Sequence, residues 1–128
     1  MNKLIIDVAN DKIFLMIITN ASTYNITYEN TKINYEKLTI IINNFLISKK
    51  LKLAEIGEIY TNKHSGSFAG IRNTISVVKA FNIVKKIDYY CYNLPDFKDE
   101  KNLSYENIPN LCKKYKIKKN LINPIYIS

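Results

Sequence analysis

Residues 64–72, which read HSGSFAGIR, constrain the local architecture of this chain more than any other stretch. They hold two of its three glycines, follow the apolar run 56–60 and lead into an apolar-periodic segment at 73–81. Glycine relieves the steric limits on the backbone, so this spacing predicts unusual dihedral angles or a close backbone approach. The sequence therefore predicts a strand, a tight turn and a helix, with Ser67 capping the first helical turn.

Three apolar runs rich in β-branched and aromatic residues open the chain. They cover residues 3–8, 12–19 and 23–28, and short polar links at 9–11 and 20–22 separate them. Links this short join antiparallel neighbours, so the sequence predicts a three-stranded meander. Residues 56–60 and 87–92 predict two further strands.

A first helix is predicted to begin at Tyr35, with Asn34 as its cap. Its apolar residues recur at the spacing of one buried stripe, made of Leu38, Ile41, Ile42, Phe45 and Leu46. The second helix follows the glycine-containing turn. One side of it carries Ile71, Ile75, Val78 and either Phe81 or Asn82.

The predicted order of elements is βββαβαβ, which indicates an α/β chain with a mixed five-stranded sheet. This is the order of one half of the actin-like (ribonuclease H-like) fold. At 128 residues we expect a single domain, with a core at 1–92, a loop at 93–103 and a helix with its tail at 104–128. Asn107 is the preferred cap of that last helix, because Pro109 then falls in its first turn. The apolar end, 121–127, is expected to dock on the body.

Some apolar residues of the two main helices lie off the buried stripes. Ile40 and Ile47 are seven residues apart and share a face, and the next helix adds Val77, Ala80 and Val84. One interpretation is that these are tolerated surface residues. The other is an apolar seam that another protein covers.

The net charge of +8 indicates nucleic-acid binding, although an AT-rich coding sequence also enriches a protein in Lys, Asn, Ile and Tyr. The candidate RNA contact is the lysine-rich end of the chain, with Tyr115 as a ring on which a base stacks. Its lysines are Lys113, Lys114, Lys116, Lys118 and Lys119.

Cys91 and Cys112 are the only cysteines and form no CxxC motif, which argues against a standard zinc or disulfide scaffold and favours a reducing compartment. The longest apolar run near the N-terminus, 13–18, is too short to span a bilayer. We expect a cytoplasmic protein with no membrane contact, cofactor or metal.

Catalytic residues are sparse. A Ser67–His64 dyad oriented by Asp7 is one interpretation, but a helix cap and a turn residue are favoured because the chain has no other histidine. The turn after Asp7 lacks the glycine that lets backbone amides approach a phosphate, so ATP binding is not expected. Arg72 lies early in its helix, where the macrodipole disfavours a cation. We expect a carboxylate to hold it, from Asp7, Glu58 or a partner.

The 64–72 stretch resembles the GPGSFTGLR signature of the TsaB (YeaZ) family. Gly66, Ser67, Phe68, Gly70 and Arg72 match it. The departures are His64 for the first glycine, Ser65 for the proline, Ala69 for the threonine and Ile71 for the leucine. Residues 4–9 and 34–38 resemble the family's first strand and first helix start, and 123–127 resembles its Pro-x-Tyr-Leu-Arg close. Family members have two actin-like halves, so the resemblance implies a shortened TsaB that keeps the first half and a remnant of the end.

The resemblance implies a non-catalytic scaffold that binds and activates the paralogue TsaD in the synthesis of threonylcarbamoyladenosine on tRNA, together with the ATPase TsaE. It also implies that the two helices form the partner interface. Exposed apolar seams make self-pairing a further expectation when TsaD is absent. The alternatives are a small basic tRNA- or RNA-binding module and an orphan actin-like nucleotide-binding enzyme.

Overall fold

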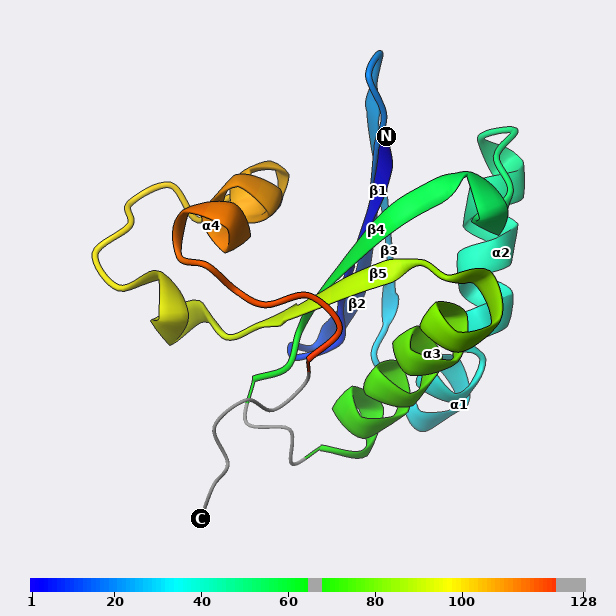
Figure 1. Cartoon of the computed structure of the whole chain (residues 1–128). Helices are drawn as coiled ribbons and strands as arrows, with labels where there is room; N and C mark the ends of the chain where they lie inside the picture. The colour runs from blue at the N-terminus through cyan, green and yellow to red at the C-terminus, as the bar shows by residue number, and fades with distance from the viewer. Residues whose placement is uncertain (65–67, 122–128) are drawn as a thin grey trace.

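The structure is a computed structural model that describes residues 1–64 and 68–121 (Figure 1). Its centre is one five-stranded sheet in the order β3-β2-β1-β4-β5. The strands are β1 (Asn2–Asp7), β2 (Lys12–Ile18), β3 (Thr23–Glu29), β4 (Ile56–Asn62) and β5 (Asp88–Tyr92). β1, β2 and β3 pair antiparallel, and β4 lies parallel to both β1 and β5. The predicted meander and mixed sheet are confirmed.

Three helices cover one face of this sheet (Figure 1). They are α1 (Lys32–Glu36), α2 (Leu38–Ser48) and α3 (Ala69–Lys85). On β1, Leu4 and Ile6 point to this side and join a core that includes Phe45 of α2 and Val78 of α3. Alternate residues of a strand face opposite sides of a sheet, so Ile5 between them must belong to a different core.

The second face is covered by α4 (Ile108–Lys114) and the segments around it (Figure 1). Short 3₁₀ turns, Leu94–Phe97 and Tyr105–Asn107, precede this helix, and a third such turn, Leu53–Glu55, precedes β4. Ile5 packs here with Phe97 and Leu111, all of them fully or almost fully buried. The sheet is therefore the middle of three layers, and its strands need apolar residues on both sides.

The start of the first helical segment differs from the prediction. Thr31, not Asn34, is the N-cap of α1, and its hydroxyl accepts a hydrogen bond from the Asn34 backbone N–H at 3.2 Å. Asn34 lies inside α1 and its side-chain amide donates to the Glu29 carbonyl at 2.9 Å. The helix is also broken at Lys37, where ψ is 19°. The predicted buried stripe of α2 is confirmed in full.

The other two predicted caps have different outcomes, since Asn107 is confirmed as the N-cap residue of α4 and the side chain of Ser67 is not among those described. Phe68 occupies the N-cap position of α3, and Ser67 lies outside the described residues. Asn107 does precede α4, and Pro109 does fall in its first turn, but the Asn107 side chain makes no cap hydrogen bond. Its amide donates instead to the Asn102 carbonyl at 2.9 Å, which closes the loop before the helix.

Beyond α4 the chain returns to the edge of β5. The Asn120 backbone N–H donates to the Tyr89 carbonyl at 2.7 Å, and the Tyr89 N–H donates to the Asn120 side-chain oxygen at 2.9 Å. These bonds cover part of an edge strand that would otherwise expose unpaired backbone groups. Apart from Leu121, the apolar end predicted to dock on the body lies outside the described residues.

Burial controls the chemistry of both thiols. Cys91 and Cys112 are buried in the cores on opposite faces of the sheet, and burial raises the pKa of each thiol to about 12. We therefore predict that Ellman's reagent at pH 8 labels neither thiol in the native protein, because thiolate is the reactive form. Both should react at once in guanidinium chloride. A native thiol reacting as fast as free cysteine would contradict the placement of that residue.

Candidate functional site

A buried carboxylate marks the edge of the sheet where β1 and β4 end. Asp7 is 3% exposed and closes β1. One of its oxygens accepts the Ala9 backbone N–H at 2.9 Å. The other accepts the Tyr105 hydroxyl at 2.8 Å and, more weakly, the Asn62 side-chain amide at 3.4 Å. Parallel strands end at the same edge of a sheet, which is how Asp7 and Asn62 meet.

Tyr105 brings the segment before α4 into this cluster, which we call the Asp7 cluster (Asp7, Ala9, Asn62 and Tyr105). Its ring stacks on Phe14 of β2, with centroids 3.9 Å apart. Burial, and then the negative charge of Asp7, raise the pKa of the Tyr105 phenol, so its hydroxyl remains a donor at neutral pH. Both oxygens of Asp7 therefore accept hydrogen bonds from the chain itself.

A second tyrosine beside this cluster is buried without a partner. Tyr92 ends β5 and is completely buried, and its hydroxyl has no hydrogen-bond partner among the described residues. Burial is the main cause that raises its pKa, followed by the charge of Asp7. A buried hydroxyl without a hydrogen bond costs free energy.

The structure describes only part of the stretch that resembles the TsaB signature, 64–72. Ser65, Gly66 and Ser67 lie outside the described residues. His64 adopts a positive φ of 44°, at the position where the family signature has its first glycine. Phe68 is exposed and Arg72 lies on the exposed side of α3. Asp7, one of the carboxylates expected to hold Arg72, accepts the donors of its own cluster, and the carboxylate partner of Arg72 stays a prediction.

Near the start of α3, the backbone at Gly70 passes close to side chains of two other segments. A Cβ atom at this position would lie 3.1 Å from the Tyr35 ring and 3.2 Å from a Val8 methyl group. The Asn73 amide also donates to the Tyr35 carbonyl at 2.6 Å, so α3 is held close to α1. The predicted close backbone approach is therefore present at Gly70.

The residues predicted to form the apolar seam are mostly exposed. Ile40 and Ile47 are 59% and 67% exposed on the side of α2 opposite its buried stripe. On α3, Val84 is 71% exposed and Ala80 is also exposed. Val77 is different, because it is half-buried and packs against the core between helices and sheet.

Sequence reasoning missed a further exposed residue of this surface. Ile83 is 75% exposed and directly precedes Val84 near the end of α3. The apolar character of α3 around more than half of its circumference was the available signal. We refer to Ile40, Ile47, Ala80, Ile83 and Val84 together as the helical apolar surface.

Several side chains of the lysine-rich end already have partners within the chain, which the sequence alone does not indicate. Lys114 forms an ion pair with Glu100 at 2.7 Å, and Lys119 lies 3.6 Å from Asp88. Tyr115 also donates to Glu100, at 3.0 Å, and its ring packs against Phe97. The other lysines of this group, Lys113, Lys116 and Lys118, are exposed.

Within residues 1–64 and 68–121, no three side chains of the His, Cys, Asp and Glu types are gathered so that they could hold a metal ion. In the same ranges, none of the helices has the length and apolar character needed to cross a membrane.

Solved structures share this fold. YeaZ from Pseudomonas aeruginosa matches with a TM-score of 0.66 and 14% identity, over 75% of this chain and 46% of that chain. A second structure, described as an uncharacterized protein with similarity to peptidase YEAZ from Pseudomonas aeruginosa, matches with the same TM-score and identity, over 75% and 45%. No protein-family model and no curated protein matches. The expected likeness to YeaZ and its actin-like fold is confirmed, and the chain spans about half the length of these structures.

Two tyrosine variants test the Asp7 cluster. Tyr105→Phe removes the hydroxyl that donates to Asp7 and keeps the ring on Phe14, so we expect a loss of about 1.5–3 kcal/mol in the free energy of unfolding. Tyr92→Phe is the matched control, because it removes a buried hydroxyl that has no partner among the described residues. It should leave stability unchanged or raise it. Urea denaturation measures both, and equal losses in the two variants would contradict the assignment.

Proposed function

We propose that this chain is a non-catalytic subunit that binds and activates a TsaD-like protein in the synthesis of threonylcarbamoyladenosine on tRNA. The observation that carries the proposal is the helical apolar surface, which lies on α2 and α3. These helices belong to a fold shared with YeaZ, and the stretch that resembles the TsaB signature, 64–72, runs from the segment between them into the first turn of α3.

The energetics favour burial of this surface against another protein. Fully burying an exposed Val or Ile side chain contributes about 1.5–3 kcal/mol. Single exposed apolar residues are common, but Ile40 and Ile47 share one face of α2, and Ala80, Ile83 and Val84 lie within five residues of α3. An apolar surface on two neighbouring helices is typical of an interaction site.

The Asp7 cluster supports a non-catalytic role. A carboxylate at the end of a central strand is suited to a metal site, but the Asp7 oxygens here accept protein donors from three segments. The word peptidase, used of one matched structure, applies to that protein alone. In this chain, the described hydrogen bonds of Asp7 do not involve His64, its single histidine.

The alternative of an RNA-binding module receives less support. Lys114, Lys119 and Tyr115 all have acidic or aromatic partners within the chain, so fewer groups are available for phosphates and bases. We therefore propose that tRNA contact, and association with a TsaE-like ATPase, occur in the complex that this chain forms with the TsaD-like protein. Without a TsaD-like partner, the helical apolar surface is expected to pair two copies of the chain weakly.

Charged substitutions test the interface. Ile47→Asp and Val84→Asp each place a charge within the helical apolar surface, and each should weaken binding to the TsaD-like protein of the same genome at least tenfold. Both side chains are well exposed, so the thermal unfolding midpoint should hardly change. Val77 is a poorer choice, because an aspartate there would also disturb the core. Calorimetry or co-purification measures the association.

Leu103→Asp is the matched control. It puts the same charge at an apolar residue that is 43% exposed in the loop before α4, and binding should be unaffected. Equal binding by wild type, I47D and V84D would exclude this surface as the interface.

A further inference from the structure

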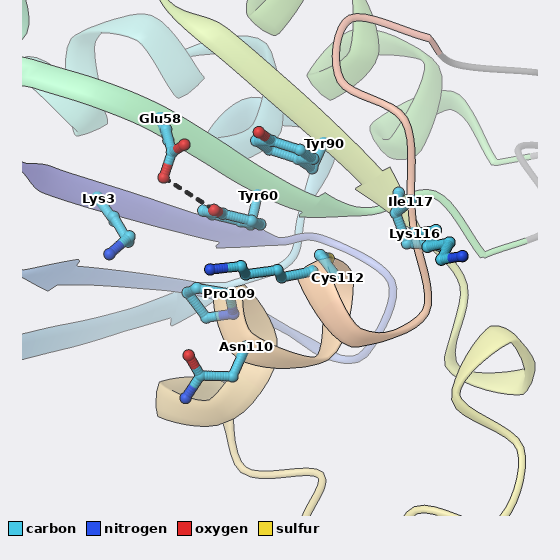
Figure 2. Close-up of a pocket in the computed structure, with 10 residues that line it drawn as sticks. Lys3, Glu58, Tyr60, Tyr90, Pro109, Asn110, Cys112, Lys116 and Ile117 are labelled. Atoms are coloured by element: carbon cyan, nitrogen blue, oxygen red, sulfur yellow. Dashed lines mark hydrogen bonds between the residues drawn. The ribbon is translucent and has the colours of Figure 1, made fainter.

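A cavity of about 540 Å³ opens on the sheet face that α4 covers (Figure 2). Its wall on the sheet side is formed by Lys3 of β1, Glu58 and Tyr60 of β4, and Tyr90 of β5. α4 and the turn after it supply the opposite wall. Its volume lies within the range of about 300–1,000 Å³ that is usual for small-molecule sites.

The position of Lys3 is unexpected for a strand residue on a covered face. It lies on the same side of β1 as the buried Ile5, and Glu58 is its neighbour in the parallel register. That carboxylate accepts the Tyr60 hydroxyl at 2.9 Å (Figure 2). Among the described residues Lys3 forms no ion pair.

Lys113 of α4 lines the same cavity and also lacks an ion pair within the described part of the chain. The next lysine, Lys114, does have one, with Glu100. Lys116 is the third lysine that lines the cavity. The cavity therefore holds more positive than negative charge, which favours an anion.

Two tyrosine side chains also line the cavity on its sheet side. The rings of Tyr60 and Tyr90 stack with centroids 4.8 Å apart and planes 8° from parallel. Tyr60 is buried, whereas Tyr90 is half-buried and lines the cavity. Cys112 also lines it, but burial raises the pKa of its thiol to about 12, so it is not a nucleophile at neutral pH.

We infer that this cavity binds a phosphate-bearing ligand of mononucleotide size. Lys3 and Lys113 hold the phosphate as point charges, since lysine binds phosphate in this way. Tyr90 offers its ring to the planar part of the ligand, and Glu58 accepts a hydrogen bond from a ligand hydroxyl or amine. Lys116 adds to the positive charge that attracts the phosphate. This site lies on the sheet face opposite α2 and α3, so it is separate from the helical apolar surface.

Calorimetric titration of the full chain with AMP, adenosine and inorganic phosphate tests the inference. We expect saturable AMP binding, and at least tenfold weaker binding for adenosine, which lacks the phosphate, and for inorganic phosphate, which lacks the ring. The double variant K3Q/K113Q should weaken AMP binding at least tenfold. The single variant K113Q should weaken it in the same direction, with an unchanged thermal midpoint.

The control K32Q/K79Q removes the same charge from exposed positions on α1 and α3, and should keep AMP affinity within twofold of wild type. The inference is overturned if AMP shows no saturable binding up to about 10 mM, or if adenosine or phosphate binds as tightly as AMP. It is also overturned if the two double variants lose affinity equally. Binding to the TsaD-like protein is measured separately with the I47D variant. The inference about this cavity and the proposed function can therefore be contradicted independently of each other.

Discussion

One buried carboxylate, that of Asp7, holds together parts of the chain that are distant in sequence. Its oxygens accept hydrogen bonds from the turn after β1, from the end of β4 and from Tyr105, which lies 98 residues further along the chain. Removing one of these donors leaves a buried acceptor without its hydrogen bond, which costs free energy. The segment before α4 is therefore fixed to the sheet, and α4 is placed to cover its second face.

This arrangement gives the two faces of the sheet different roles. On one face α4 and its flanking turns complete a core within the chain, with Phe97 and Leu111 packed on Ile5. On the other face the helices bury one side on the sheet and present Ile47 and Val84 to the outside. The first face closes the fold, and the second is the face that we propose to bind a partner. The polar edge between them is occupied by the Asp7 cluster.

The sequence predicts much of this fold because its signals are local. Short links require an antiparallel meander, and the spacing of Leu38, Ile42 and Phe45 defines one buried side of α2. The first helix cap is not predictable in this way, because Thr31 and Asn34 are both good cap residues and the choice depends on Asn34 reaching Glu29. The pairing of Tyr105 with Asp7, and the presence of Lys3 and Lys113 in one cavity, depend on tertiary folding and have no local sequence signal.

The proposed role depends most on the helical apolar surface being the docking face. Amide hydrogen exchange of this chain, measured alone and with the TsaD-like protein of the same genome, tests that claim directly. We predict added protection in α2 and α3, at residues 38–48 and 69–85, with exchange in α4 unchanged. Protection confined to α4, or no protection in α2 and α3 when a complex has formed, would contradict it.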